Sequence, residues 1–82
     1  MSYDIEYEFQ VPINVVKDIV DNYNSSLSFE EVLNNRDLLK RLLLNYIVNK
    51  YIYELEGVDI EKAYNNMVVE EKKKFFYVKI II

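Results

Sequence analysis

A strict alternation of polar and apolar side chains near the start of the chain is the strongest constraint on the fold. From Asp4 to Val11, every odd position is apolar and every even position bears a carboxylate or an amide. A period of two is typical of a β-strand with one face in the core and one in water. Pro12 follows, which cannot extend a strand ladder but suits the first turn of a helix. The sequence therefore predicts an N-terminal strand whose polar face holds Asp4, Glu6, Glu8 and Gln10.

Helical spacing replaces this alternation after Pro12. Apolar residues recur every three or four positions up to about Tyr23, which predicts a first helix that ends at Asn24-Ser25-Ser26. Ser28 and Glu31 then have the spacing of a capping box, in which the hydroxyl accepts a hydrogen bond from the backbone amide of the third helical residue. A second short helix should begin there. Either Asn34 or Asn35 is expected to cap the helix that follows.

Residues 36–56 predict a long central helix that is closed by Gly57. Its apolar side chains cover most of the circumference, and a helix of this kind is buried on more than one side. In so short a chain, this pattern favours a helix at the centre of the domain or one that is shared between two subunits. We therefore expect a homodimer.

The last third of the chain predicts one more helix and one more strand. Asp59 caps the helix, and Glu70-Glu71 would form ion pairs with Lys72-Lys73-Lys74 at its end. Residues 75–82 are β-branched or aromatic except for Lys79. This composition suits a strand that is buried on both faces or one that pairs beside the first strand.

Together these elements predict one helix-rich α+β domain over residues 1–82. It has an N-terminal strand, three to four helices with a long central one, and a C-terminal strand. A chain of 82 residues has no room for a second core, and its 51% of apolar residues with a single Gly and a single Pro argue against disorder.

The chain lacks the side chains on which most enzymes depend. It contains no His and no Cys, which excludes the usual hydrolase triad, a thiolate nucleophile and histidine or cysteine metal sites. Glu6 and Glu8 share a strand face and could form a carboxylate pair or bind a hard cation, although a solvated face is the simpler interpretation. With Gly57 alone, no glycine-rich phosphate loop exists. We expect no enzymatic activity, no cofactor and no metal.

The charge balance narrows the class of partner. The net charge of −4 counts against nucleic acid, because phosphate backbones repel an acidic domain. Lys72-Lys73-Lys74 beside aromatic residues resembles a single-strand binder, but Glu70 and Glu71 neutralise much of that patch. No signal peptide or membrane-length apolar run is visible, so we expect a cytoplasmic protein and no membrane partner. Its abundant Asn, Lys, Ile and Tyr have A- and T-rich codons, as is common in viral and plasmid accessory proteins.

Residues 4–53 resemble a ribbon-helix-helix regulator. Asp4–Val11 would be the ribbon, Pro12–Tyr23 the first helix and Asn35–Leu43 the start of the second. The resemblance implies a dimer in which two ribbons pair antiparallel and their outward side chains enter the major groove. Two features depart from the family. An extra capped segment, Ser28–Asn34, separates the helices, and the positions that would face bases are Asp4, Glu6, Glu8 and Gln10, which bring carboxylates against phosphates.

The sequence thus predicts a small interaction protein, such as an inhibitor encoded by a virus or a plasmid. Its acidic strand would mimic phosphates and block a basic, nucleic-acid-binding surface of another protein, inside the host cell if the source is viral. The alternative is a dimeric DNA-binding regulator of the ribbon-helix-helix type. The expected partner-binding residues lie at the first strand: Tyr3, Asp4, Glu6, Tyr7, Glu8 and Gln10.

Overall fold

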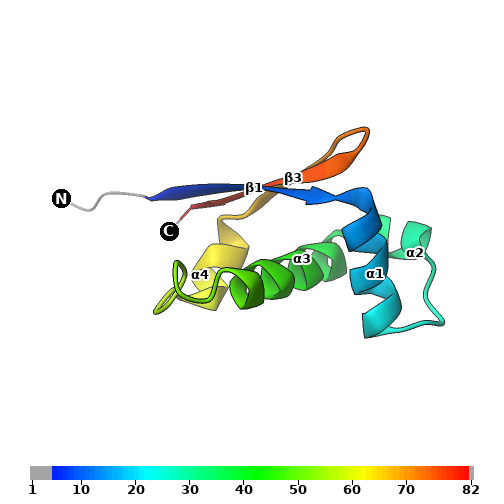
Figure 1. The fold of residues 1–82 in the computed structure, drawn as a ribbon, viewed down its shortest axis with the longest axis horizontal. Coiled ribbons are helices and arrows are strands. Elements are labelled where there is room, and N and C mark those ends of the chain that lie inside the picture. The colour runs from blue at the N-terminus through cyan, green and yellow to red at the C-terminus, as the bar shows by residue number, and fades with distance from the viewer. Residues whose placement is uncertain (1–4, 82) are drawn as a thin grey trace.

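The computed structural model describes residues 5–81. Its three strands form one sheet, and its helices lie together on one side of that sheet (Figure 1). The predicted helix-rich α+β class is confirmed, with two C-terminal strands where the sequence predicted one. Along the chain the elements are β1 (Glu6–Pro12), α1 (Ile13–Tyr23), α2 (Phe29–Leu33), α3 (Arg36–Lys50), α4 (Ile60–Asn65), β2 (Val68–Glu71) and β3 (Phe75–Ile81).

The C-terminal strand β3 is the centre of the sheet. It is antiparallel to both neighbours, and the strand order is β1–β3–β2. The register places Glu8 opposite Lys79 and Gln10 opposite Tyr77 on one side, and Glu70 opposite Tyr77 on the other. Of the two alternatives for the last strand, the structure shows the one in which it pairs beside the first, and only one of its faces is fully buried.

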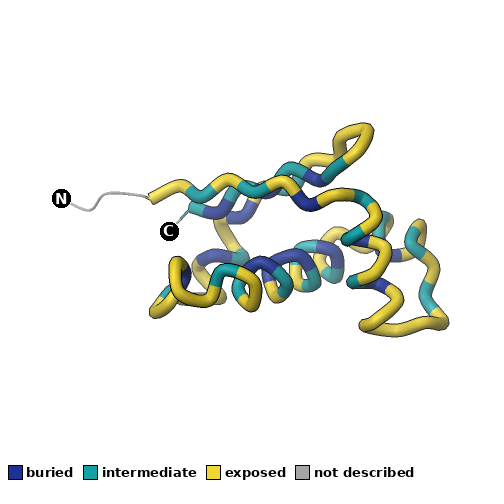
Figure 2. Tube along the Cα trace, in the orientation of Figure 1, coloured by how far each residue is buried: buried dark blue, intermediate teal, exposed yellow. Residues whose placement is uncertain are grey.

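The core lies between the inner face of the sheet and α3 (Figure 2). Because side chains alternate along a strand, β3 turns every second residue toward the helices. No polar or charged side chain is buried among the described residues. From the sheet and from α3, the buried residues are Val11, Phe76, Val78 and Ile80, and Leu39, Leu43, Leu44 and Ile47.

Three helices begin at the predicted capping residues. In each case a side-chain oxygen accepts a hydrogen bond from the backbone N–H of the third helical residue, which otherwise has no partner within the helix. The pairs are Ser28 with Glu31 at 3.1 Å, Asn35 with Leu38 at 3.3 Å and Asp59 with Lys62 at 3.2 Å.

The long helix α3 is shorter than predicted. It ends at Lys50, and turns occupy residues 51–57. Tyr51 leaves helical geometry, and its ring packs against Phe9 of β1 with the centroids 5.0 Å apart. The aromatic and β-branched run that starts at Tyr51 also has a low helix propensity. Gly57 has a positive φ of 81°, as the sequence suggested, but it closes this turn and not the helix.

The prediction for the segment after Asp59 is wrong in its second half. The helix ends at Asn65, and Val68–Glu71 forms the strand β2. Two asparagines and then two β-branched valines disfavour a longer helix and favour a strand. Glu70-Glu71 therefore lies on a strand, and Lys72-Lys73-Lys74 forms the tip of a hairpin instead of a helix end.

Candidate functional site

The outer sheet face is the side of the sheet that no helix covers (Figure 1). Its side chains alternate with those of the core, so the strands turn them away from α3. Those of β1 are exposed, whereas those of the central strand are half-buried by their neighbours. We define this surface by Glu6, Glu8 and Gln10 of β1, Phe75, Tyr77 and Lys79 of β3, and Val68 and Glu70 of β2.

The electrostatics of this face are set by three carboxylates around one lysine. The Nζ atom of Lys79 lies 3.6 Å from Oε2 of Glu6, and the Nζ atom of Lys72 lies 2.9 Å from Oε2 of Glu70. The acidic strand β1 therefore meets one cation of its own chain, Lys79. Within residues 5–81, Glu8 has no ion-pair partner. The acidic character of the face is therefore strongest along β1.

Tyr77 is at the centre of the outer sheet face and responds to these charges. Desolvation by its neighbours is the first cause that raises its pKa, and the adjacent carboxylate of Glu8 is the next. Glu70 and Glu6 add smaller contributions in the same direction, because a phenolate is disfavoured beside carboxylates. The phenol therefore stays protonated, and able to donate a hydrogen bond, to a higher pH than an ordinary tyrosine.

The structure brings together part of the site that the sequence predicts. Glu6, Glu8 and Gln10 share the outer sheet face, as expected. Tyr7 does not share it, because this residue points to the helical side, where it packs against the core and stacks beside Phe9 with ring centroids 6.4 Å apart. Tyr3 and Asp4 lie outside the described residues.

Sequence reasoning missed the half of this face that comes from the C-terminal hairpin. Tyr77, Lys79 and Glu70 reach the face only through pairing between strands that are distant in sequence. The signal that could have found two of them is the alternation within residues 75–81, where Tyr77 and Lys79 fall between the apolar residues of the core.

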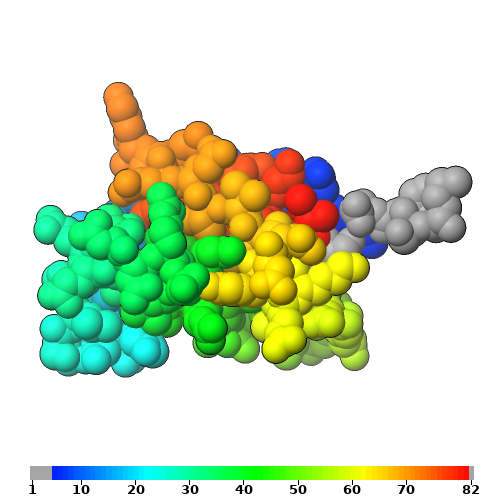
Figure 3. Space-filling view, turned by 180° about the vertical axis from the view of Figure 1, so that it is seen from behind, coloured from blue at the N-terminus to red at the C-terminus, as the bar shows by residue number. Residues whose placement is uncertain are grey.

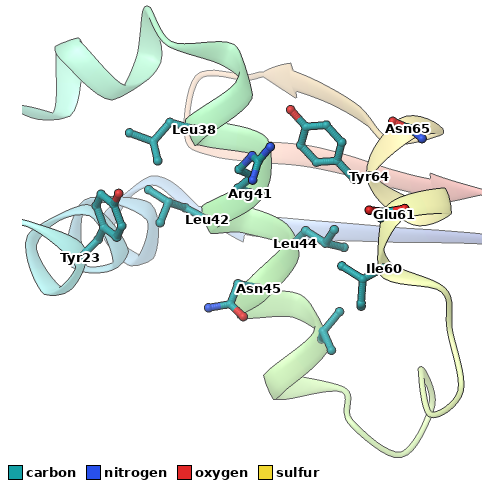
Figure 4. A pocket seen from close by; sticks show the side chains of 11 residues that line it. Tyr23, Leu38, Arg41, Leu42, Leu44, Asn45, Ile60, Glu61, Tyr64 and Asn65 are labelled. Carbon is teal, nitrogen blue, oxygen red and sulfur yellow. The ribbon is translucent and has the colours of Figure 1, made fainter.

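An open groove of about 830 Å³ lies on the helical side, away from the sheet (Figure 4). The α3 helix forms its floor, and α1 and α4 form its sides. At its rims, Tyr23 is 56% exposed and Ile60 is 48% exposed. The other lining residues are Leu38, Arg41, Leu42, Leu44, Asn45, Val48, Glu61, Tyr64 and Asn65.

Tyr64 of α4 contacts three residues of α3 along one side of this groove. Its hydroxyl donates a hydrogen bond to Oδ1 of Asp37 at 2.8 Å, and this bond raises the pKa of the phenol. The Nζ atom of Lys40 lies 4.4 Å from the centre of the ring, and the guanidinium of Arg41 lies 5.3 Å from it. These cation–π contacts fix the side chain between the two helices. These contacts hold α4 in place against α3, so this side of the groove is formed by packed helices.

The lysine-rich tip of the β2–β3 hairpin is a third exposed feature. It projects from the body of the molecule at the end of the sheet (Figure 3). The backbone N–H of Lys72 donates to the carbonyl of Phe75 at 2.9 Å, which closes the turn. The carbonyl of Lys74 accepts a hydrogen bond from the N–H of Ile13 at 3.1 Å, so the tip is tied to the start of α1.

Neither a metal cluster nor a membrane-length helix is present within residues 5–81. No group of three or more acidic, His or Cys side chains in this range could hold a metal ion. None of the helices formed by these residues is both long enough and apolar enough to cross a bilayer.

No family model and no curated protein matches the sequence, and no solved structure matches the fold. The likeness to ribbon-helix-helix regulators therefore stays a prediction.

Proposed function

We propose that this protein is a small, non-enzymatic interaction protein whose outer sheet face binds a basic surface of another protein. The observation that supports this best is the uncovered face itself, on which Glu6, Glu8 and Glu70 are exposed opposite all the helices. One face of an antiparallel sheet can remain in water, where it is free to meet a partner. Carboxylates on such a face attract a cationic partner and steer its approach.

The partner class that we favour is a protein whose basic surface ordinarily binds nucleic acid. Carboxylates at regular intervals along a strand present negative charge as a phosphate backbone does. In this role the protein is an inhibitor, encoded by a virus or a plasmid, that acts inside the cell. Blocking a surface requires no catalytic group, which agrees with a chain that has neither His nor Cys.

A lysine-rich peptide, used as a probe for a basic surface, tests where the site lies. Its addition to isotope-labelled protein should shift the amide resonances of Glu8, Tyr77 and Lys79. The amides of Glu30 and Glu31 on α2 are the control, because these exposed carboxylates lie outside the sheet. Shifts as large on α2 as on the sheet would contradict an outer-face site and indicate unspecific charge attraction.

The alternative function is a dimeric DNA-binding regulator. One observation favours it, since the even-numbered side chains of β1 are exposed and alternate with those of the core, as the outward side chains of a ribbon do. The carboxylates of Glu6 and Glu8 oppose it, because they would repel phosphates. Titration with duplex DNA at low salt separates the two functions. Binding to DNA that strengthens in the variant Glu6→Gln/Glu8→Gln would favour the regulator.

We also propose that the chain forms a homodimer through the groove on its helical side. The support for this is the position of Tyr23 and Ile60, which expose apolar surface at opposite rims of one concavity. Half-buried Leu38 and Leu42 continue this surface across the floor. Exposed polar residues such as Arg41 and Asn45 lie among these side chains, and an apolar surface with a polar rim is typical of interaction sites. The dimer contact would leave the outer sheet face free.

A further inference from the structure

The hydrogen-bond pattern of the sheet shows which backbone groups of β1 are free. The N–H of Ile13 donates to the carbonyl of Lys74 at 3.1 Å, and this pair continues the register between β1 and β3. Residue pairs in an antiparallel ladder alternate between hydrogen-bonded and non-hydrogen-bonded. Val11 and Phe9 therefore direct their N–H and C=O groups toward β3. The even-numbered residues between them direct theirs to the opposite edge.

This opposite edge of β1 is open. In the strand order β1–β3–β2, no strand lies beyond β1, and within residues 5–81 no hydrogen bond occupies the outward backbone groups of Glu8 and Gln10. Pro12 ends the strand at an even position, where its missing N–H costs no ladder bond. An unpaired strand edge of this kind is a template for another extended chain.

We propose that this edge of β1 accepts an extended segment of the partner protein as a fourth, antiparallel strand, and that the segment has Lys or Arg at every second position. The inference rests on the proposed function and specifies the shape of the ligand. Main-chain hydrogen bonds to Glu8 and Gln10 would supply affinity, as in other cases of strand addition. A residue that pairs directly with Glu8 has its side chain on the same face, so a cation at that position meets the carboxylate.

The charge of the strand selects this occupant over a second copy of the chain. If two β1 strands paired antiparallel, Glu6 and Glu8 of both copies would lie on one face, and like charges directly opposite one another are destabilising. The other free edge of the sheet, that of β2, belongs to a strand of four residues that ends in the lysine tip. The carboxylates of this strand lie beside three lysines, and Glu70 already pairs with Lys72 at 2.9 Å. The β1 edge is thus the acceptor whose length and charge both fit.

Hydrogen exchange provides the most direct test. The probe is a capped seven-residue peptide in which threonine and lysine alternate, with lysine at the three even positions. In the free protein, the amides of Glu8 and Gln10 should exchange rapidly and those of Phe9 and Val11 slowly. Saturation with the probe should slow exchange at Glu8 and Gln10 by roughly tenfold or more, because these N–H groups gain partners. Exchange that stays fast at both residues in the saturated complex would overturn strand addition.

Methylated probes are the matched control. A lysine that pairs with Glu8 in a hydrogen-bonded pair uses its own N–H, whereas the N–H groups of the intervening threonines point away. N-methylation of the lysine amides should therefore abolish binding, and N-methylation of the threonine amides should preserve it. Equal binding of both methylated peptides would contradict the proposed pairing. Because this test changes only the peptide, its result does not depend on how a protein variant folds.

Two variants separate this inference from the proposed function. Gln10→Pro removes one outward N–H and leaves the charges, and Glu6→Gln/Glu8→Gln removes the charges and leaves the edge. Each variant should weaken probe binding. For Glu6→Gln/Glu8→Gln we expect a loss of affinity of roughly fivefold, because two cross-strand charge pairs are lost. If only the charge variant weakens binding, the acidic face binds its ligand without strand addition. If neither variant weakens it, both the inference and the proposed function fail.

Discussion

The residue-scale features that fix the helices are side-chain oxygens at their first positions. Ser28, Asn35 and Asp59 each satisfy a backbone N–H that has no partner within its helix. Because these bonds are local, the chain can define where each helix begins before tertiary contacts form. The residues are all exposed, so their contribution comes from the bond and not from burial.

Replacement of Ser28 by Ala should therefore lower the free energy of unfolding by about 0.5–2 kcal/mol, since α2 loses its cap. Chemical denaturation monitored by circular dichroism measures the change. Ser25→Ala is the matched control, because Ser25 is exposed in the turn before α2 and should have little effect. An unchanged stability for Ser28→Ala would mean that the cap does not hold the helix.

The phenol of Tyr77 reports on the charge of the outer sheet face. Its pKa is raised in the folded state, so the protonated form favours folding. This contribution is present below the pKa of the unfolded chain, about 10, and is lost as the pH rises through the folded value. In Glu8→Gln the pKa of Tyr77 should fall toward its ordinary value. Near-ultraviolet titration measures the pKa of Tyr77, and Tyr77→Phe made in both the parent and the Glu8→Gln protein identifies its signal. An unchanged pKa in Glu8→Gln would contradict the role of Glu8.

At the scale of elements, the sequence predicted those helices and strands that are determined by a local pattern of residues. The alternation of residues 4–11 and the capping oxygens identified β1 and the starts of three helices. The end of α3 was predicted too late, because the low helix propensity of the run from Tyr51 was not weighed and the contact between Tyr51 and Phe9 joins residues far apart in sequence. The strand β2 was missed because it is only four residues long. Glu6, Glu8 and Gln10 were identified because their own strand alternates, whereas the position of Tyr77 and Lys79 beside them depends on the register between β1 and β3.

The α3 helix is the element on which the sheet packs. Leu43 is fully buried at its centre, so Leu43→Ala should destabilise the protein by about 2–5 kcal/mol through lost transfer energy and the cavity that remains. Leu42→Ala, one position along on the groove side and half-buried, should cost less. Equal effects in thermal denaturation of the two variants would contradict the assignment of the buried face.

At the scale of the whole molecule, the fold is asymmetric. All the helices lie on one side of the sheet, which leaves one uncovered sheet face and, on the far side of α3, a groove of mixed polar and apolar lining (Figures 1 and 4). The two surfaces differ in chemistry. The sheet face is charged and has an open strand edge, whereas the groove exposes large apolar residues at its rims. The proposed homodimer and the proposed partner would therefore use different surfaces of the molecule.

Light scattering tests the homodimer. At micromolar concentration the mass should be about twice the 9.9 kDa of one chain. Ile60→Ser should shift the protein toward the monomer, because it removes apolar surface from the rim of the groove. Val68→Ser, which alters an exposed apolar residue on the outer sheet face, should leave the dimer intact. A monomeric mass for the parent protein at high concentration would remove the groove as a dimer interface.

The salt dependence of binding tests the central claim, that the carboxylates of β1 attract a basic partner. The dissociation constant for the alternating lysine peptide would be measured over a series of salt concentrations for three proteins: the parent, Glu6→Gln/Glu8→Gln, and Glu54→Gln/Glu56→Gln. The last variant makes the same change in net charge in the exposed turn after α3. We predict weaker binding and a flatter salt dependence for the β1 variant alone, because screening acts on charges at the contact. Identical affinities and slopes for all three proteins would contradict the account.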